Sequence, residues 1–312
     1  MEKKYTVVTR DLTKTYDDKS VVNKLNLRIP GSEIFGFLGV EGAGKTTTIL
    51  MLLGLVKPTS GSAIVLGHDS GTEPLKVKQL VGYLAEQSGF YDYLTAFQNL
   101  KFTAEINQVP REEIEKNIYE AMNTVGIRDM ADKVVGEFSS DATRLLALAD
   151  ILTKKPALVI LEEPFEGVSD KAKERINEVI SSLPKSGITV VLVSSHFFQI
   201  QKMCNRIGVL LNGKLVVEGL VDHLGSQKNE VHYRIEVETR KPVPKLLEDV
   251  KHLNGVIDVE ARDSCLILTT KTDIRSQLTR IMNINNAPPV HMRISSFNVS
   301  DIYNKYFRER EH

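Results

Sequence analysis

GVEGAGKTTT, residues 39–48, fits the pattern G-x-x-x-x-G-K-[ST]. It follows an apolar segment, EIFGFLG (33–39), and opens KTTTILMLLGL (45–55), which has helical character. In this strand–turn–helix context, the backbone N–H groups of residues 42–46 point at a phosphate, and the helix dipole adds to the attraction. The stretch therefore predicts a phosphate-binding loop at the end of a buried strand.

The pattern assigns roles to individual residues of this loop. Lys45 is expected to reach the β and γ phosphates of a nucleotide, and Thr46 to supply a hydroxyl group to Mg²⁺. The alternative, an ordinary glycine-rich turn, is disfavoured by the flanking strand and helix. The loop residues expected at the nucleotide are Gly39, Val40, Glu41, Gly42, Ala43, Gly44, Lys45, Thr46 and Thr47.

Two adjacent carboxylates end a second apolar run, LVILEEP, residues 158–164. They could simply mark the point where a buried strand meets water. A phosphate loop that cleaves ATP, however, needs a carboxylate near Mg²⁺ and a group that activates water, both at the end of a neighbouring strand. We therefore predict that Glu162 holds the Mg²⁺ shell and that Glu163 polarises the attacking water.

Composition excludes several classes of protein. The 312 residues contain 40 Lys and Arg against 40 Asp and Glu, so the zero net charge argues against a nucleic-acid partner. Cys204 and Cys265 show no metal-ligand spacing, and we expect both to be reduced thiols in a cytosolic protein. The amino terminus lacks the apolar core of a signal peptide, and no run of ~18 apolar residues predicts a membrane span.

The order of elements predicts two domains. Residues 1–225 alternate strands and helices, with a helical subdomain at about 90–155, and GSQKNE (225–230) is expected to be a linker. Within the first domain, continuous apolar runs predict a parallel sheet that is buried on both faces. Residues 226–312 predict a small α+β domain of split βαβ type, in which no catalytic constellation is evident.

Several segments together resemble a known family. LTKTYDDKSVV (12–22), the phosphate loop, GYLAEQSGFY (82–91), LVILEEP and VLVSSH (191–196) have the order and spacing of ABC transporter ATPase domains. The resemblance covers roughly residues 5–220. The tail SSFNVSDIYNKYF (295–307) also resembles the end of the accessory domain on ATPases of ABC-2-type exporters.

The resemblance implies an α/β fold of the P-loop NTPase class: a mixed sheet core, an antiparallel β subdomain and a helical subdomain, followed by the small α+β domain. It implies ATP hydrolysis with ATP and Mg²⁺ bound, Tyr16 stacked on adenine and His196 at the γ-phosphate. Glu86 aligns with the family's glutamine, and we expect it to contact Mg²⁺ and to contribute to catalysis. The implied partners are separate transmembrane permease subunits and a second ATPase subunit, at the cytoplasmic face of the membrane.

The chain departs from the family most clearly in FSSDATRLLALADIL, residues 138–152. The family has L-S-G-G-Q here, and this signature binds the γ-phosphate held by the opposite subunit. Ser139 matches, whereas Ser140, Asp141 and Ala142 replace Gly-Gly-Gln. Asp141 puts a negative charge where an anion should bind, although an acid in a first helical turn also complements the helix dipole and caps its N–H groups. Ser169 replaces an aspartate of the loop that communicates across the dimer.

Two functions remain as hypotheses. The first is the ATP-binding subunit of an ABC exporter, weakened at the site that uses its own signature. The second is a soluble ABC-type regulatory or binding module with little ATP turnover.

GFYDYLTAF (89–97), with Phe90, Tyr91, Tyr93 and Phe97, is either a docking surface for the membrane subunit or part of the helical core. A heterodimer and a homodimer both remain open, and the sequence does not identify the cargo.

Overall fold

A computed structural model of the chain describes residues 5–86, 89–196, 200, 202–221, 233–239, 246, 249–250, 253–262, 265–270, 272–285 and 287–296. It divides into two compact units, Met1–Gly219 and Leu220–His312. The sequence suggested a boundary after residue 225.

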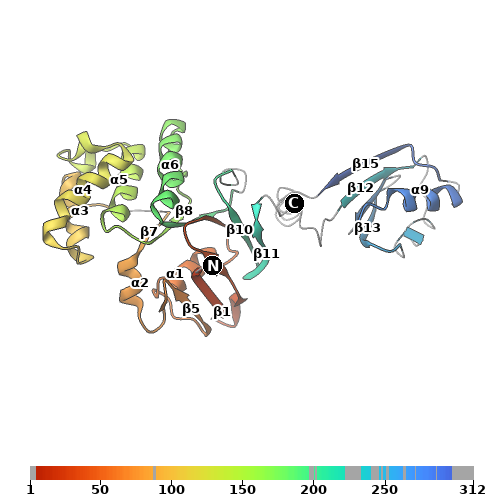
Figure 1. The fold of residues 1–312 in the computed structure, drawn as a ribbon, viewed down its shortest axis with the longest axis horizontal. Coiled ribbons are helices and arrows are strands. Elements are labelled where there is room, and N and C mark those ends of the chain that lie inside the picture. Colours follow the sequence, from red (N-terminus) through yellow and green to blue (C-terminus); the bar gives the residue numbers. More distant parts are fainter. Residues whose placement is uncertain are drawn as a thin grey trace. The chain divides into compact units, whose positions relative to one another are not determined.

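A six-stranded sheet in the first unit, in the order β11-β10-β4-β9-β8-β7, carries the predicted loops (Figure 1). The five strands from β10 to β7 run parallel, so their carboxyl ends meet at one edge. Every residue of β4, β8 and β9 is buried, as the continuous apolar runs predicted. The strands are β4 (Ile34–Leu38), β7 (Val81–Leu84), β8 (Leu158–Glu162), β9 (Thr189–Ser194), β10 (Arg206–Leu211) and β11 (Lys214–Leu220).

A second sheet of this unit is antiparallel, in the order β2-β1-β5-β6, with β3 paired to β1. One hydrophobic cluster contains side chains from both sheets and from helix α1 (Lys45–Leu52). Its members include Leu12, Phe37, Ile49 and Val191. The helix that follows the phosphate loop is thus fixed in the core. The strands are β1 (Tyr5–Tyr16), β2 (Lys19–Leu25), β3 (Arg28–Pro30), β5 (Ser60–Val65) and β6 (His68–Asp69).

Three helices form the helical part of the first unit: α3 (Ala96–Ile106), α4 (Arg111–Val125) and α5 (Ser140–Thr153) (Figure 1). A capping box between Thr95 and Gln98 begins α3, and Gly126, in a left-handed conformation, ends α4. The other helices here are α2 (Pro74–Leu80) and α6 (Asp170–Ser182). Among the described helices, none combines the length and apolar content needed to cross a lipid bilayer.

The second unit contains a four-stranded antiparallel sheet in the order β13-β14-β12-β15. Strand β14 separates β12 from β13, which is the split arrangement that the sequence predicted. The sequence also predicts a helix near 244–253, of which the structure describes only positions 246, 249, 250 and 253, and a final helix, which lies outside the described residues. The elements are β12 (Tyr233–Glu238), β13 (Val256–Arg262), β14 (Cys265–Thr270), α9 (Arg275–Ile284) and β15 (His291–Ser296).

Candidate functional site

The predicted phosphate loop connects β4 to α1. Gly44 immediately precedes the helix with a φ angle of 101°, a left-handed conformation that residues with a side chain rarely adopt. A Cβ atom at Gly44 would also lie 2.5 Å from the carbonyl oxygen of Val21 in β2. Conformation and space both require glycine at this position, and the loop lies directly against β2.

Lys45 is the first residue of α1, and its ammonium group lies across the loop. Nζ donates hydrogen bonds to the carbonyl oxygens of Gly39 at 2.6 Å and Val40 at 3.1 Å. Burial lowers the pKa of Lys45, and the nearby carboxylates of Glu163 and Glu162 oppose that shift. A phosphate could replace the carbonyl oxygens as a stronger, charged acceptor.

Glu162 is the last residue of β8, and its side chain is held by a neighbouring strand. The residue is only 6% exposed, and Tyr83 of β7 donates its hydroxyl hydrogen to Oε2 of Glu162. Burial raises the pKa of Tyr83, and the hydrogen bond to Glu162 raises it further, so the phenol remains a donor. Sequence reasoning missed Tyr83, although a tyrosine within an apolar strand needs a hydrogen-bond partner.

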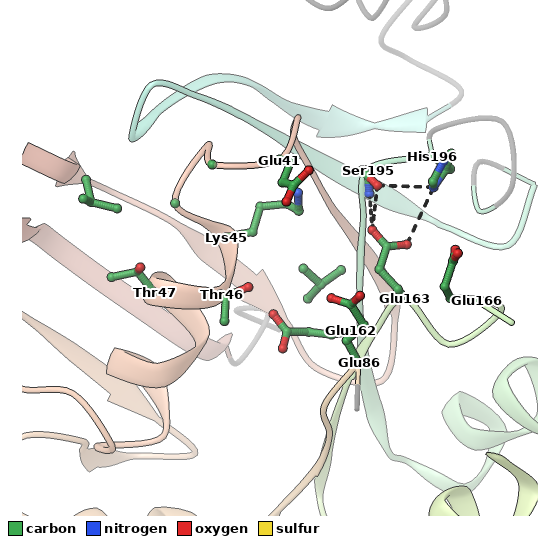
Figure 2. A pocket seen from close by; sticks show the side chains of 14 residues that line it. Glu41, Lys45, Thr46, Thr47, Glu86, Glu162, Glu163, Glu166, Ser195 and His196 are labelled. Atoms are coloured by element: carbon green, nitrogen blue, oxygen red, sulfur yellow. Dashed lines mark hydrogen bonds and ion pairs between the residues drawn. The ribbon is translucent and has the colours of Figure 1, made fainter. Parts of the chain in front are cut away.

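Glu163 follows β8 in a left-handed backbone conformation with a φ angle of 41°. Its Oε2 accepts a hydrogen bond from Ser194 Oγ at 2.8 Å. Its Oε1 accepts hydrogen bonds from the backbone N–H of Ser195 at 2.5 Å and from Ser195 Oγ at 2.8 Å (Figure 2). His196 Nδ1 lies 3.9 Å from Oε2. The end of β9 therefore fixes the Glu163 carboxylate, and no pattern in the sequence indicated these serine contacts.

These residues surround one pocket of about 380 Å³ at the strand ends (Figure 2). The loop, the strand-end carboxylates and His196 come together there although they are far apart in the sequence. Val21, Glu166, Val193 and Ser195 also line the pocket and were not predicted. The predicted site residues that line it are Glu41, Gly42, Gly44, Lys45, Thr46, Thr47, Glu86, Glu162, Glu163 and His196.

The remaining predicted site residues are not among those that line this pocket: Gly39, Val40 and Ala43 in the loop, Tyr16 and Ser139. Tyr16 is 44% exposed at the end of β1, and Lys14 Nζ lies 4.7 Å from the centre of its ring. Its stacking on adenine stays a prediction.

The donor groups in the pocket fit Mg²⁺ that arrives together with phosphates. Mg²⁺ is usually held by one or two carboxylates, with phosphate oxygens and water completing the shell. Thr46, Glu86 and Glu162 line the pocket beside Lys45 (Figure 2). Within the described part of the chain, no group of three or more His, Cys, Asp or Glu side chains could hold a metal ion by itself.

Asp141 and Ser169, two positions at which this chain departs from the family pattern, contact each other. Ser139 is the N-cap of α5 and accepts a hydrogen bond from the N–H of Ala142. The carboxylate of Asp141 instead accepts hydrogen bonds from the N–H of Ser169 at 2.8 Å and from its hydroxyl at 2.5 Å. These bonds lower the pKa of Asp141. Ser139 rather than Asp141 therefore caps the helix, and Asp141 stays ionised at the start of α5.

Comparison with known proteins supports the family resemblance. The family model described as ABC transporter matches residues 22–166. The bacitracin transport ATP-binding protein BcrA of Bacillus licheniformis is 34% identical, over 81% of this chain and 84% of that protein. BcrA of Enterococcus faecalis is 30% identical over 96% of both chains. The linearmycin resistance ATP-binding protein LnrL of Bacillus subtilis is 32% identical over 70% of both.

Solved structures agree with the fold. An ATP-binding subunit of an ABC transporter superposes with a TM-score of 0.66 at 22% identity, over 72% of this chain and 93% of that one. The dimeric ATP-binding cassette MJ0796, in a post-hydrolysis state with ADP and phosphate, gives a TM-score of 0.62 at 22% identity, over 69% and 98%.

The sheet, the phosphate loop and the matching family model define an ATPase of the P-loop class. The chain belongs to the ABC transporter family, in which it is an ATPase subunit whose ATP hydrolysis is coupled to transport. Its fold is the ABC ATPase domain followed by a small α+β unit.

Replacement of Lys45 by alanine should weaken ATP binding by at least about tenfold, because the variant loses charge-assisted hydrogen bonds to the phosphates. Isothermal titration calorimetry of Mg-ATP measures the change. Lys116→Ala, which removes a 71% exposed lysine of α4, is the control and should bind as the unmodified chain does. Equal affinity in Lys45→Ala and the control would contradict the assignment of this loop.

Proposed function

We propose that the chain is the ATP-binding subunit of an ABC exporter, which uses Mg-ATP to drive separate transmembrane permease subunits. The observation that carries this proposal is the single pocket in which Lys45 and Thr46 face Glu162 and Glu163. The relatives support it, because their names describe ATP-binding proteins of bacitracin transport and linearmycin resistance. In this proposal the permease holds the chain at the cytoplasmic face of the membrane.

Glu163 activates water in the proposed reaction. The loop N–H groups and Lys45 bind the β and γ phosphates, which leaves the γ-phosphate facing the end of β8. The hydrogen bonds from Ser194 and Ser195 hold the Glu163 carboxylate in one orientation. His196, beside that carboxylate, donates to the γ-phosphate as charge develops on it.

The proposed metal ligands are Thr46, Glu86 and Glu162. Bound Mg²⁺ would neutralise charge on the β and γ phosphate oxygens. The hydrogen bond from Tyr83 fixes one oxygen of Glu162 and leaves the other to orient water of the metal shell. Glu86 lies two residues after β7, in the segment that leads from the proposed metal site towards the helical part of the domain.

The proposed contact with a permease is the surface formed by Tyr91, Tyr93, Phe102 and Ile106. These side chains are between 42% and 76% exposed, and the rings of Tyr91 and Phe102 pack edge to face at 5.3 Å. Phe97 is half-buried and packs on Tyr119 of α4. The exposed apolar surface fits docking of a permease helix. Cargo selection would rest with that permease.

The proposed partner across the nucleotide is a different ATPase subunit. This chain keeps Lys45, Thr46 and Glu163 for its own nucleotide, but its signature carries Asp141. The ionised carboxylate repels a phosphate from the opposite subunit, and its bonds to Ser169 stabilise it in that place. A partner with an intact signature would complete one competent site, whereas two copies of this chain would form two weakened ones. A slowly working homodimer remains the second candidate.

Replacement of Glu163 by glutamine should leave ATP binding intact and lower turnover by about 10²-fold or more, because the base is removed while the shape is kept. Single-turnover hydrolysis of radiolabelled ATP and calorimetric binding measure the two effects. The control is Glu174→Gln, which changes an exposed glutamate of α6. Turnover equal to that of the unmodified chain would show that another group activates the water.

The unmodified chain alone should hydrolyse ATP feebly, and Ser140→Gly with Asp141→Gly should raise its rate, because the glycines let phosphate approach the helix. Steady-state ATPase assays compare the two. Ser169→Ala is the matched control: it removes one hydrogen bond of Asp141 but keeps the charge, so it should give no gain. Rapid hydrolysis by the unmodified chain, with no increase in rate in the double glycine variant, would contradict an impaired signature.

A further inference from the structure

Arg144 is a buried arginine in the second turn of α5, close to the pocket but not among its lining residues. The residue is only 8% exposed. Burial lowers the pKa of Arg144, and the carboxylates of Glu86, Glu166 and Glu163 oppose that shift. A buried cation is costly unless it makes several good hydrogen bonds, so its contacts show what it does.

All three guanidinium nitrogens of Arg144 donate to backbone carbonyl oxygens of two loops. Nη1 binds the carbonyls of Ala85 at 3.2 Å and Glu86 at 2.9 Å, in the loop after β7. Nε binds the carbonyl of Pro164 at 3.2 Å, and Nη2 binds the carbonyl of Glu163, in the loop after β8. One planar fork therefore joins the two loops that carry Glu86 and Glu163.

The Glu163 backbone needs such support because its φ angle of 41° is unfavourable for a residue with a side chain. Conformations of this kind persist where the surrounding structure fixes them. The N–H of Glu163 donates to the carbonyl of Val193 at 2.9 Å, and its own carbonyl accepts from Arg144. Both peptide groups of the strained residue are thus held, one by the sheet and one by α5.

We propose that Arg144 is a positioning residue for ATP hydrolysis: by binding the carbonyls of Glu86, Glu163 and Pro164, it holds both carboxylate-bearing loops in register with α5. This inference rests on the proposed role of Glu163. The first turn of α5 is the signature segment, so Arg144 also ties the position of the water-activating carboxylate to the helix that faces the partner subunit. Lysine cannot replace it, because a single ammonium group cannot reach four carbonyls in a plane.

The test compares Arg144→Gln and Arg144→Lys with the unmodified full chain in single-turnover ATP hydrolysis. We expect the rate constant to fall by about 10²-fold in Arg144→Gln, since small displacements of a catalytic group have effects of that size. Affinity for Mg-ATP should stay within about threefold, because the phosphate loop binds the nucleotide. Arg144→Lys should recover only part of the rate.

Arg175→Gln is the matched control. Arg175 of α6 also donates to backbone carbonyls, those of Thr124 at 2.8 Å and Val125 at 3.3 Å, but at the end of α4. Its loss should lower thermal stability, by less because its side chain is 39% exposed, and should leave the hydrolysis rate constant unchanged. An equal fall in rate in both variants would show that Arg144 matters only for folding and would overturn the proposal.

Two further measurements separate this inference from the proposed function. In a Glu163→Gln background, Arg144→Gln should cause a much smaller further fall in rate, because the water-activating carboxylate is already gone and only the Glu86 loop remains to be displaced. Amide hydrogen exchange in residues 163–169 should be about tenfold faster in Arg144→Gln and unchanged in Arg175→Gln. Exchange that is unchanged in Arg144→Gln overturns the positioning role, whether or not the chain hydrolyses ATP. A Glu163→Gln variant with full activity would instead overturn the proposed function.

Discussion

The excess of carboxylates over cations in the pocket is the main physical constraint on the site. Five carboxylates, those of Glu41, Glu86, Glu162, Glu163 and Glu166, line the same space as the one lysine of the phosphate loop. A pair of unit charges 4 Å apart interacts by about 4 kcal/mol at an effective dielectric constant of about 20. We therefore expect a divalent cation to accompany the nucleotide, because Lys45 is one cation against five carboxylates and a triphosphate.

Donors from two different elements hold the carboxylates of Glu162 and Glu163. Tyr83 of β7 binds Glu162, and Ser194 and Ser195 at the end of β9 bind Glu163. Arg144 binds the backbone of both acidic loops rather than the carboxylates themselves. The parallel sheet makes this possible, because it brings the ends of β7, β8 and β9 to one edge. Stability and function thus depend on the same hydrogen bonds.

Local patterns in the sequence predicted the phosphate loop, the buried strands and the strand-end position of Glu162 and Glu163. Each of those features depends on residues that are neighbours in the chain. The contacts of Tyr83, Ser195 and Arg144 could not be predicted, because they depend on which strands and loops become neighbours in space. The bond between Asp141 and Ser169 is of the same kind: each departure was visible alone, but the contact joins residues 28 positions apart.

We expect the pocket to bind a nucleotide only as its complex with a divalent cation. Calorimetric titration of ATP into the full chain, with Mg²⁺ present and then with Mg²⁺ removed by EDTA, measures this dependence. ATP should bind with Mg²⁺ present, and its affinity should be at least about 10²-fold weaker without it, since two or more repulsions of the size given above are then unrelieved. Equal affinity under the two conditions would contradict this expectation, because it would mean that Lys45 and the loop N–H groups suffice against five carboxylates.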